Sequence, residues 1–288
     1  MTTRPLLRLH PAERDDIGDL VTRRPLPNPR LPQLDPFLFL NHHGPQTYEP
    51  DNCGLPFAPH PHRGFETITF ILEGSLAHSD TGGHESVIDA GGVQWMTAGS
   101  GLIHAELSPA AFKREGGEME ILQLWLNLPA RLKMSAPRYT GLQQPNIPAV
   151  EPAPGATLDL ISGTLDATTG PVESLTDTFM STVRLAPGVE VELPAPAGRT
   201  VFLYVVRGEV SVEGAPAPQW HLAELGDGDI VRVASPDGAL LLFGHGAPLN
   251  EPVVAYGPFV MNTREEIAQA VQDYQRGLLG DPAALAGA

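Results

Sequence analysis

Short hydrophobic runs separated by polar turns dominate the pattern of this chain. Four of them lie at residues 67–72, 92–96, 121–126 and 201–206, and each is rich in β-branched or aromatic residues. Gly, Pro or Asp bounds these runs, and the chain carries 30 glycines and 30 prolines, too many for long helices. Many short strands with frequent turns predict an all-β protein built as an antiparallel sandwich or barrel.

The C-terminal region has a different period. Residues 263–266 read Thr-Arg-Glu-Glu, which is a capping box for a helix that begins there. Apolar residues follow at helical spacing, so we expect one face of an amphipathic helix to pack on a barrel. The expected members of that face are Ile267, Ala270, Val271, Tyr274 and Leu278.

The two halves of the chain resemble each other. Residues 71–74 (Ile-Leu-Glu-Gly) are similar to residues 205–208 (Val-Val-Arg-Gly), and residues 92–95 are similar to residues 228–231. A repeat of this length indicates a duplicated β-domain rather than a solenoid, whose units are much shorter.

Length and composition fit this division. A chain of 288 residues is long for one domain and comfortable for two. The proline-rich stretch 145–154 is expected to connect the halves as irregular extended backbone. We therefore expect domains at residues 1–140 and 141–288, of which the second ends in the helix.

Charge and cysteine content narrow the function classes. The formal net charge of -16 argues against binding to a nucleic-acid backbone, which requires a basic surface. Residues 1–20 alternate charge and apolarity too finely for a signal peptide, and no apolar run is long enough to span a membrane. The single cysteine, Cys53, fits a reducing compartment and a loop position better than a ligand role. We expect a cytoplasmic protein that is large enough to be a stable monomer.

Two short strings carry the candidate chemistry, His60-Pro-His62 and His104-Ala-Glu106. Alternate side chains of a strand point to the same face, so each string can present both of its polar side chains together. The strand-like runs and glycine turns between the strings could fold the second pair over the first. Three imidazoles and one carboxylate would then converge, and such a set suits a divalent metal such as Fe, Mn, Co, Ni or Zn.

The second half offers no equivalent ligands. We therefore expect it to be a structural partner, and its histidines, His221 and His245, not to bind metal. The positions that correspond to the four candidate ligands are Pro194, Pro196, Leu240 and Leu242.

Longer motifs surround the two strings. Residues 60–67 read His-Pro-His-Arg-Gly-Phe-Glu-Thr, and residues 94–99 read Gln-Trp-Met-Thr-Ala-Gly. Further islands at 35–38, 122–127 and 257–263 extend the pattern from near the start almost to the end. In these motifs the whole chain resembles the pirin family of bicupins.

The resemblance implies two cupin barrels face to face, with one metal ion in the N-terminal barrel. Fe(II) is the leading ion, and Mn, Co, Ni, Cu and Zn are the alternatives. Glu66 lies where many other cupins place a carboxylate ligand, but pirins use the later glutamate, so Glu66 is expected to support the site. The ligand positions that the resemblance implies are His60, His62, His104 and Glu106.

Several pirins are quercetin 2,3-dioxygenases, so the resemblance implies a flavonol-like aromatic substrate that reacts with O₂. Glu106 or Glu66 would assist deprotonation of the substrate 3-oxygen, which makes these two the candidate catalytic residues. The alternative is a non-enzymatic regulator whose iron redox state controls binding to a transcription factor or a metabolic enzyme. A structural zinc site is a third option. We favour the enzyme.

The remaining histidines and aromatic residues have simpler interpretations. His42 and His43 are adjacent, so they are expected to be loop residues at a barrel rim rather than ligands. His78 and His84 bracket a glycine turn and are expected to be solvated. Core packing accounts more simply than a substrate pocket for three apolar residues of the motifs, Phe65, Trp95 and Met96.

Overall fold

Two compact units, each assembled from separate segments, make up the computed structural model, which describes residues 1–285. The site unit comprises residues 14–23, residues 37–144 and the chain from Leu249 onwards; the second unit comprises residues 1–13, 24–36 and 145–248. The chain passes between units at residues 144–145, close to the expected boundary. However, residues 1–13 and 24–36 belong to the second unit, and residues 249–285 belong to the site unit. Two consecutive domains would have assigned these segments the other way round.

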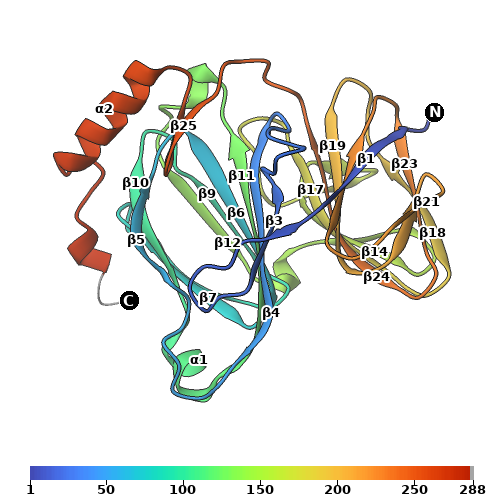
Figure 1. The fold of residues 1–288 in the computed structure, drawn as a ribbon, viewed down its shortest axis with the longest axis horizontal. Coiled ribbons are helices and arrows are strands. Elements are labelled where there is room, and N and C mark those ends of the chain that lie inside the picture. Colours follow the sequence, from blue (N-terminus) through green and yellow to red (C-terminus); the bar gives the residue numbers. More distant parts are fainter. Residues whose placement is uncertain (286–288) are drawn as a thin grey trace. The chain divides into compact units, whose positions relative to one another are not determined.

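The site unit contains two antiparallel sheets (Figure 1). The larger has the order β12 (Arg138–Leu142), β9 (Val93–Thr97), β6 (Phe65–Glu73), β11 (Gly117–Asn127), β4 (Phe37–Tyr48), β3 (Thr22–Leu26) and β2 (Glu13–Arg14). The smaller has the order β5 (Phe57–His62), β10 (Leu102–Leu107), β7 (Ser75–Asp80) and β8 (Glu85–Asp89). A separate hairpin joins β25 (Val254–Tyr256) to β26 (Phe259–Met261). Ile71 and Ile121 of the larger sheet share a buried cluster with Leu76 and Ile88 of the smaller sheet, so the two sheets pack as a sandwich.

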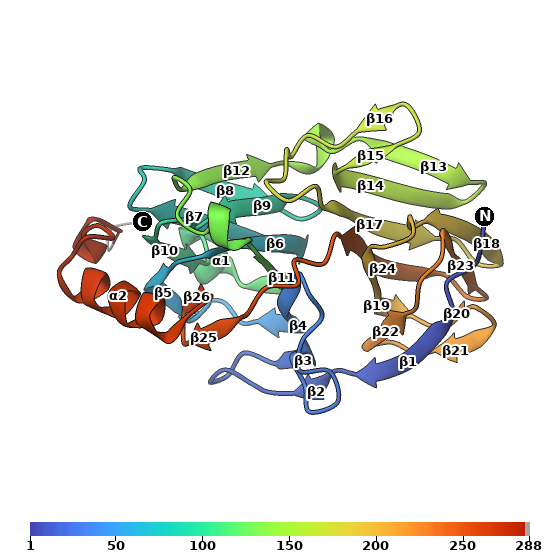
Figure 2. The same ribbon diagram turned by 90° about the horizontal axis from the view of Figure 1, so that it is seen from above.

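The second unit repeats this arrangement of a seven-stranded and a four-stranded sheet (Figure 2). The larger has the order β1 (Leu6–Pro11), β22 (His221–Leu225), β19 (Thr200–Gly208), β24 (Ala239–Gly246), β17 (Phe179–Leu185), β14 (Ala156–Ser162) and β13 (Ala149–Ala153). The smaller has the order β18 (Val189–Pro194), β23 (Ile230–Ser235), β20 (Val210–Val212) and β21 (Ala215–Ala217), and β15 (Thr164–Leu165) pairs with β16 (Thr168–Thr169). One apolar cluster, which includes Leu203 and Val233, fills the space between the sheets. The all-β fold with a duplicated domain is therefore confirmed.

The four predicted hydrophobic runs all form strands, in β6, β9, β11 and β19. β6 and β11 are central strands with both faces largely buried, which explains their nearly continuous apolar sequences. The expectation of an irregular connection at 145–154 was only partly right, because the stretch contains β13. That strand lies at the edge of its sheet, where Pro152 removes no ladder hydrogen bond that the fold needs.

Helices are few and short. The α-helices are α1 (Ala110–Glu115) and α2 (Arg264–Gln275), and the 3₁₀ turns are η1 (Ala130–Leu132), η2 (Gln144–Asn146) and η3 (Pro282–Leu285). Among residues 1–285, no helix combines the length and the apolar character needed to span a bilayer.

The capping box of α2 is confirmed. The Thr263 hydroxyl accepts from the backbone N–H of Glu266, whose carboxylate accepts in return from the backbone N–H of Thr263. Ile267 and Ala270 are buried in a cluster with Ile103 of β10, so the helix packs within the site unit. The expected apolar face is shorter than the pattern suggested: Leu278 lies beyond the helix and is 68% exposed, and Tyr274 is 38% exposed.

Replacing the cap residue should loosen α2. We expect Thr263→Ala to lower the free energy of unfolding by about 1 kcal/mol, because the N–H of Glu266 loses its partner. Urea unfolding followed by circular dichroism measures this change. Thr263→Ser keeps the hydroxyl and should retain most of the stability, and an equal loss in both variants would contradict the capping explanation.

Candidate metal centre

Three histidines of the site unit converge between its two sheets. His60 and His62 lie two residues apart on β5, and antiparallel pairing with β10 places His104 directly opposite His60. One ligand nitrogen from each residue lies within 4.8 Å of the others, and the Nε2 atoms of His60 and His104 are 3.0 Å apart. His62 and His104 are buried, whereas His60 is half-buried. These three residues form the His triad.

A glycine turn after His62 places the triad against the larger sheet. Gly64 connects β5 to β6 with a φ of +92°, and a Cβ atom there would overlap the Val260 carbonyl oxygen. Only glycine adopts this backbone conformation without strain. The chain can therefore cross from one sheet to the other within two residues.

Backbone carbonyls fix the tautomers of two of the rings. A carbonyl oxygen only accepts, so Nδ1 of His60 donates to Ala58 at 2.8 Å, and Nδ1 of His62 makes a longer contact of 3.4 Å to Pro258. Both Nε2 atoms then carry the ring lone pair, which is the arrangement that metal-binding imidazoles adopt, and the lone pair of His60 faces His104 Nε2 at 3.0 Å. Burial is the main reason that the pKa values of His62 and His104 lie well below the usual range, and the neighbouring imidazoles lower them further.

Glu106 follows His104 on the same face of β10 but is not within coordination distance of the whole triad. Its carboxylate is buried and accepts hydrogen bonds from two side chains of the larger sheet. Thr69 Oγ1 donates to Oε1 at 2.8 Å, and Gln123 Nε2 donates to Oε2 at 2.6 Å. Among the described residues no lysine or arginine pairs with this carboxylate. A buried carboxylate held only by neutral donors is suited to a cation, because buried charges in proteins are paired or bind metals.

Glu66 points away from the triad. β6 pairs with β9 without a bulge, so Glu66 lies on the opposite face from Phe65 and Thr69, the residues that contact His62 and Glu106. Thr97 Oγ1 donates to Glu66 Oε1 at 2.6 Å. Burial raises the pKa of Glu66 to about 7, although hydrogen bonds from Thr97 and Trp95 act in the other direction. The structure therefore does not bring Glu66 together with the other candidate site residues.

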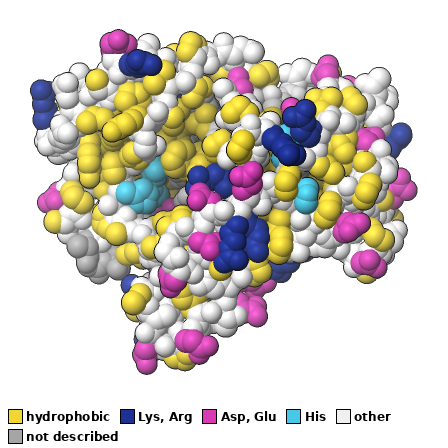
Figure 3. All heavy atoms as spheres, in the orientation of Figure 1, with side chains coloured by type: hydrophobic (Ala, Val, Ile, Leu, Met, Phe, Trp, Pro, Cys, Tyr) yellow, Lys and Arg dark blue, Asp and Glu magenta, His cyan; other side chains and the backbone are white. Residues whose placement is uncertain are grey.

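Aromatic side chains of the larger sheet border the triad. The His62 ring lies 5.1 Å from the Phe65 ring and 5.3 Å from the Trp125 ring, measured between centroids. Trp125 also stacks on Phe39 at 4.7 Å, and both of these residues are half-buried. Figure 3 shows histidine side chains at the edge of a broad hydrophobic area on this face of the molecule. Trp95 and Met96 are buried, as expected for core residues. The sequence analysis did not identify Trp125 as a residue next to the triad, because its strand is almost entirely apolar.

His78 is a further histidine near the triad, and the expectation that it is solvated was wrong. It occupies an inward-facing position of β7, is 3% exposed, and its ring centroid lies 5.5 Å from that of His104. Its Nε2 atom lies 3.0 Å from Asp80, and Tyr139 stacks on it at 4.0 Å. The strand continues up to Asp80, so only residues after it form the turn. His84 is partly exposed, as expected.

His42 and His43 are also not loop residues. Both are fully buried on β4, where adjacent positions face opposite sides of the sheet. His42 Nε2 lies 2.8 Å from Glu120 Oε1, and His43 Nδ1 lies 2.8 Å from Thr22 Oγ1. The sequence interpretation failed because the strand runs twelve residues through a Pro-containing segment.

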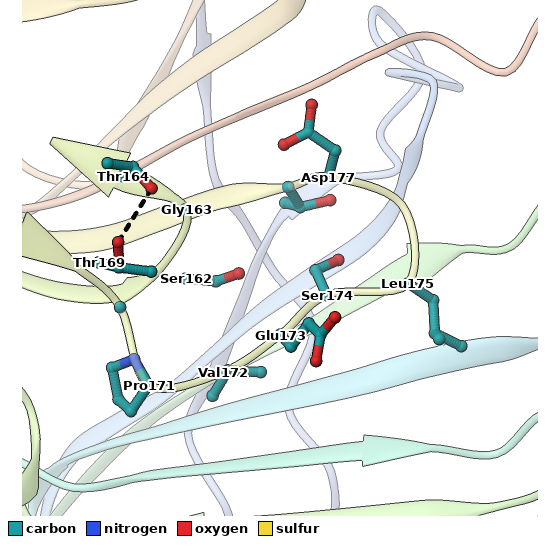
Figure 4. Close-up of a pocket in the computed structure, with 12 residues that line it drawn as sticks. Ser162, Gly163, Thr164, Thr169, Pro171, Val172, Glu173, Ser174, Leu175 and Asp177 are labelled. Carbon is teal, nitrogen blue, oxygen red and sulfur yellow. Dashed lines mark hydrogen bonds between the residues drawn. The ribbon is translucent and has the colours of Figure 1, made fainter.

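The second unit contains a hollow of different character. It has a volume of about 550 Å³, and Figure 4 shows its hydroxyl-bearing side chains, of which Thr164 and Thr169 bond to each other at 3.3 Å. Glu173 and Asp177 contribute carboxylates. Within residues 1–285, the only group of three close metal-ligating side chains is the triad of the site unit.

His245 of the second unit is held by an arginine rather than by other ligands. Arg199 Nε donates to its Nδ1 at 2.7 Å, and Phe179 stacks on the ring. Burial and the Arg199 charge lower the pKa of His245 to about 3. Its Nδ1 lone pair is therefore already in use.

The residues of the site unit fit a divalent metal ion. His60 and His62 present their Nε2 atoms beside His104, and the Glu106 carboxylate lies two residues along the same strand as His104. Because His60 carries its proton on Nδ1, the hydrogen between His60 Nε2 and His104 Nε2 belongs to His104, and it would move to His104 Nδ1 if His104 bound a metal ion through Nε2. A mixed nitrogen and oxygen donor set suits Fe, Mn, Co, Ni, Cu or Zn, and the donor types do not select among them.

Comparison with known proteins places these features in one family. The Pirin family matches residues 19–126, and the Pirin C-terminal cupin domain matches residues 180–280. A pirin-like protein of Caulobacter vibrioides is 40% identical over 96% of this chain and 99% of its own length, and human pirin is 39% identical over 90% of this chain and 87% of its own. A crystal structure of quercetin 2,3-dioxygenase from Acinetobacter baumannii covers 97% of this chain and 99% of its own, with a TM-score of 0.92 and 32% sequence identity.

Removing one imidazole should abolish tight metal binding. We expect the wild-type protein to bind one equivalent of Ni(II) and His104→Ala to lose it, because two imidazoles remain at the centre. Equilibrium dialysis with elemental analysis measures the stoichiometry. His221→Ala and His245→Ala are controls in the second unit and should keep the full equivalent. Loss of metal from either control would show that the second unit holds the ion.

Glu66 should affect stability rather than metal binding. The folded protein keeps a proton on Glu66 that the unfolded chain releases between about pH 4.5 and 7, so its contribution to the free energy of unfolding falls as pH rises through this range. We expect wild type to lose about 3 kcal/mol relative to Glu66→Gln across that range. Urea unfolding at several pH values measures the difference, and a pH-independent difference would contradict the assignment.

Proposed function

The chain belongs to the pirin family, and on that premise we propose that it is a metal-dependent dioxygenase that cleaves a flavonol such as quercetin with O₂. The observation that carries this proposal is the convergence of His60, His62 and His104 beside the buried Glu106 carboxylate, whose hydrogen-bond donors among the described residues are neutral. The likeness to the Acinetobacter baumannii quercetin 2,3-dioxygenase supports the choice of reaction.

His60, His62, His104 and Glu106 are the residues that would hold the metal, with Fe(II) the leading ion and Mn, Co, Ni, Cu and Zn the alternatives. When bound, such an ion supplies Lewis-acid stabilisation of a phenolate and a route for electrons to O₂. The low pKa values of His62 and His104 keep these two rings unprotonated near neutral pH, so protons compete weakly for their lone pairs.

The surrounding side chains suit a planar phenolic substrate. Phe65 and Trp125 offer ring surfaces next to His62, against which the flavonol rings can lie. In this proposal Glu106 accepts the proton of the substrate 3-hydroxyl, and its position two residues from His104 on the inward face of β10 supports that role. The flavonol and O₂ together then give the ring-opened ester and carbon monoxide, which balances all atoms.

Oxygen uptake tests this proposal. Protein loaded anaerobically with Fe(II), Mn(II), Co(II), Ni(II) or Cu(II) is mixed with quercetin in an oxygen-electrode cell, and His104→Ala treated in the same way is the control. We expect uptake in at least one loaded form and at least a hundredfold less in the control. Tight metal binding without uptake in any form would rule out the dioxygenase and favour redox-dependent binding to a protein partner.

A further inference from the structure

Two side chains of the larger sheet clamp Glu106, and neither belongs to the expected ligand set. We propose that Thr69 and Gln123 are positioning residues that orient the Glu106 carboxylate as the fourth metal ligand. This inference rests on the metal centre of the proposed function, but not on the identity of the substrate.

The clamp is built from directly paired strands. Gln123 of β11 and Thr69 of β6 are cross-strand partners, so their side chains project side by side from the same face of the sheet. Each engages a different oxygen of Glu106, which comes from β10 of the opposite sheet. Two donors on two oxygens fix the plane of the carboxylate. Glu106 therefore needs no further ordering before it binds an ion.

The chemistry of the donors leaves the carboxylate available. An ionised carboxylate only accepts, so the amide NH₂ of Gln123 must face Glu106. Each carboxylate oxygen has two lone pairs and gives one to the clamp, so lone pairs remain for a metal ion. Both donors are neutral, so neither contributes a positive charge next to the buried carboxyl group. Lysine or arginine in their place would cancel the charge that attracts a cation.

Gln94 is a neighbouring glutamine that ties the sheets together without touching Glu106. It pairs with Thr69 on the side opposite to Gln123 and is also buried, and its Nε2 donates to the Leu76 carbonyl of β7 at 3.1 Å. Gln94 and Gln123 thus flank the same threonine and both bridge the two sheets. They differ in that only Gln123 reaches the carboxylate, so Gln94 is a matched control for loss of a bridging amide.

Competition with a chromophoric chelator measures the Ni(II) dissociation constant of each variant and needs no catalytic turnover. We expect Gln123→Leu and Thr69→Val each to weaken Ni(II) binding by about 10–100-fold, the usual cost of removing a hydrogen bond that orients a ligand. Thr69→Ser keeps the hydroxyl and should bind nearly as well as wild type. Gln94→Leu should change the dissociation constant less than about threefold, because its amide does not contact Glu106.

A double substitution decides whether Gln123 acts through Glu106. In a Glu106→Ala background, Gln123→Leu should cause no further loss of affinity, because the group it orients is absent. Unchanged affinity in the Gln123→Leu single variant, tighter binding in it, or an undiminished loss in the double variant would overturn the proposal. Oxygen uptake is a separate measurement: its absence alongside the expected affinities would reject the dioxygenase and leave the clamp standing.

Discussion

The antiparallel pairing of β5 with β10 is the constraint on which the centre depends. Its register sets His104 opposite His60 and, through the two-residue period of the strands, turns His62 and Glu106 toward the same interior. A slip of one residue would move every inward side chain of one strand to the other face. After His62, the turn at Gly64 carries the chain from β5 into β6 of the larger sheet. The chemistry is thus a consequence of strand pairing rather than of any loop.

Much of this arrangement is readable from local sequence. The strand-forming runs of β6, β9, β11 and β19 are bounded by turn residues, and the capping box of α2 uses residues only three apart. The His triad was predictable for the same reason, because alternation along a strand is a local rule and His60 and His62 obey it. The family motifs supplied the remaining step, the pairing of the two strings.

Other residues near the triad could not be identified from the sequence, because their role depends on which face of a strand points toward the triad. The sequence of a strand that is buried on both faces is apolar throughout and does not indicate that face. Glu66 and Thr69 lie three positions apart on β6 and therefore on opposite faces. His78 looked like a turn residue because its strand ends in polar residues, although it faces inward. Gln123 is one polar residue in an apolar strand, and only the folded sheet shows that it meets Glu106. The assignment of residues 1–13, 24–36 and 249–285 to their units depends on contacts between residues far apart in the sequence. Local sequence patterns do not predict such contacts.

The support of His62 has a consequence for how the protein matures. The carbonyl that faces its Nδ1 belongs to Pro258, 196 residues later, and the adjacent Arg63 forms an ion pair with Asp273. During synthesis on the ribosome, all three histidines leave the exit tunnel long before these partners have been made. For most of translation, His62 in the nascent chain therefore lacks the Pro258 carbonyl that faces its Nδ1 atom. Tight capture of the proposed metal ion would therefore follow completion of the polypeptide, and metal loading would be a late step of biogenesis.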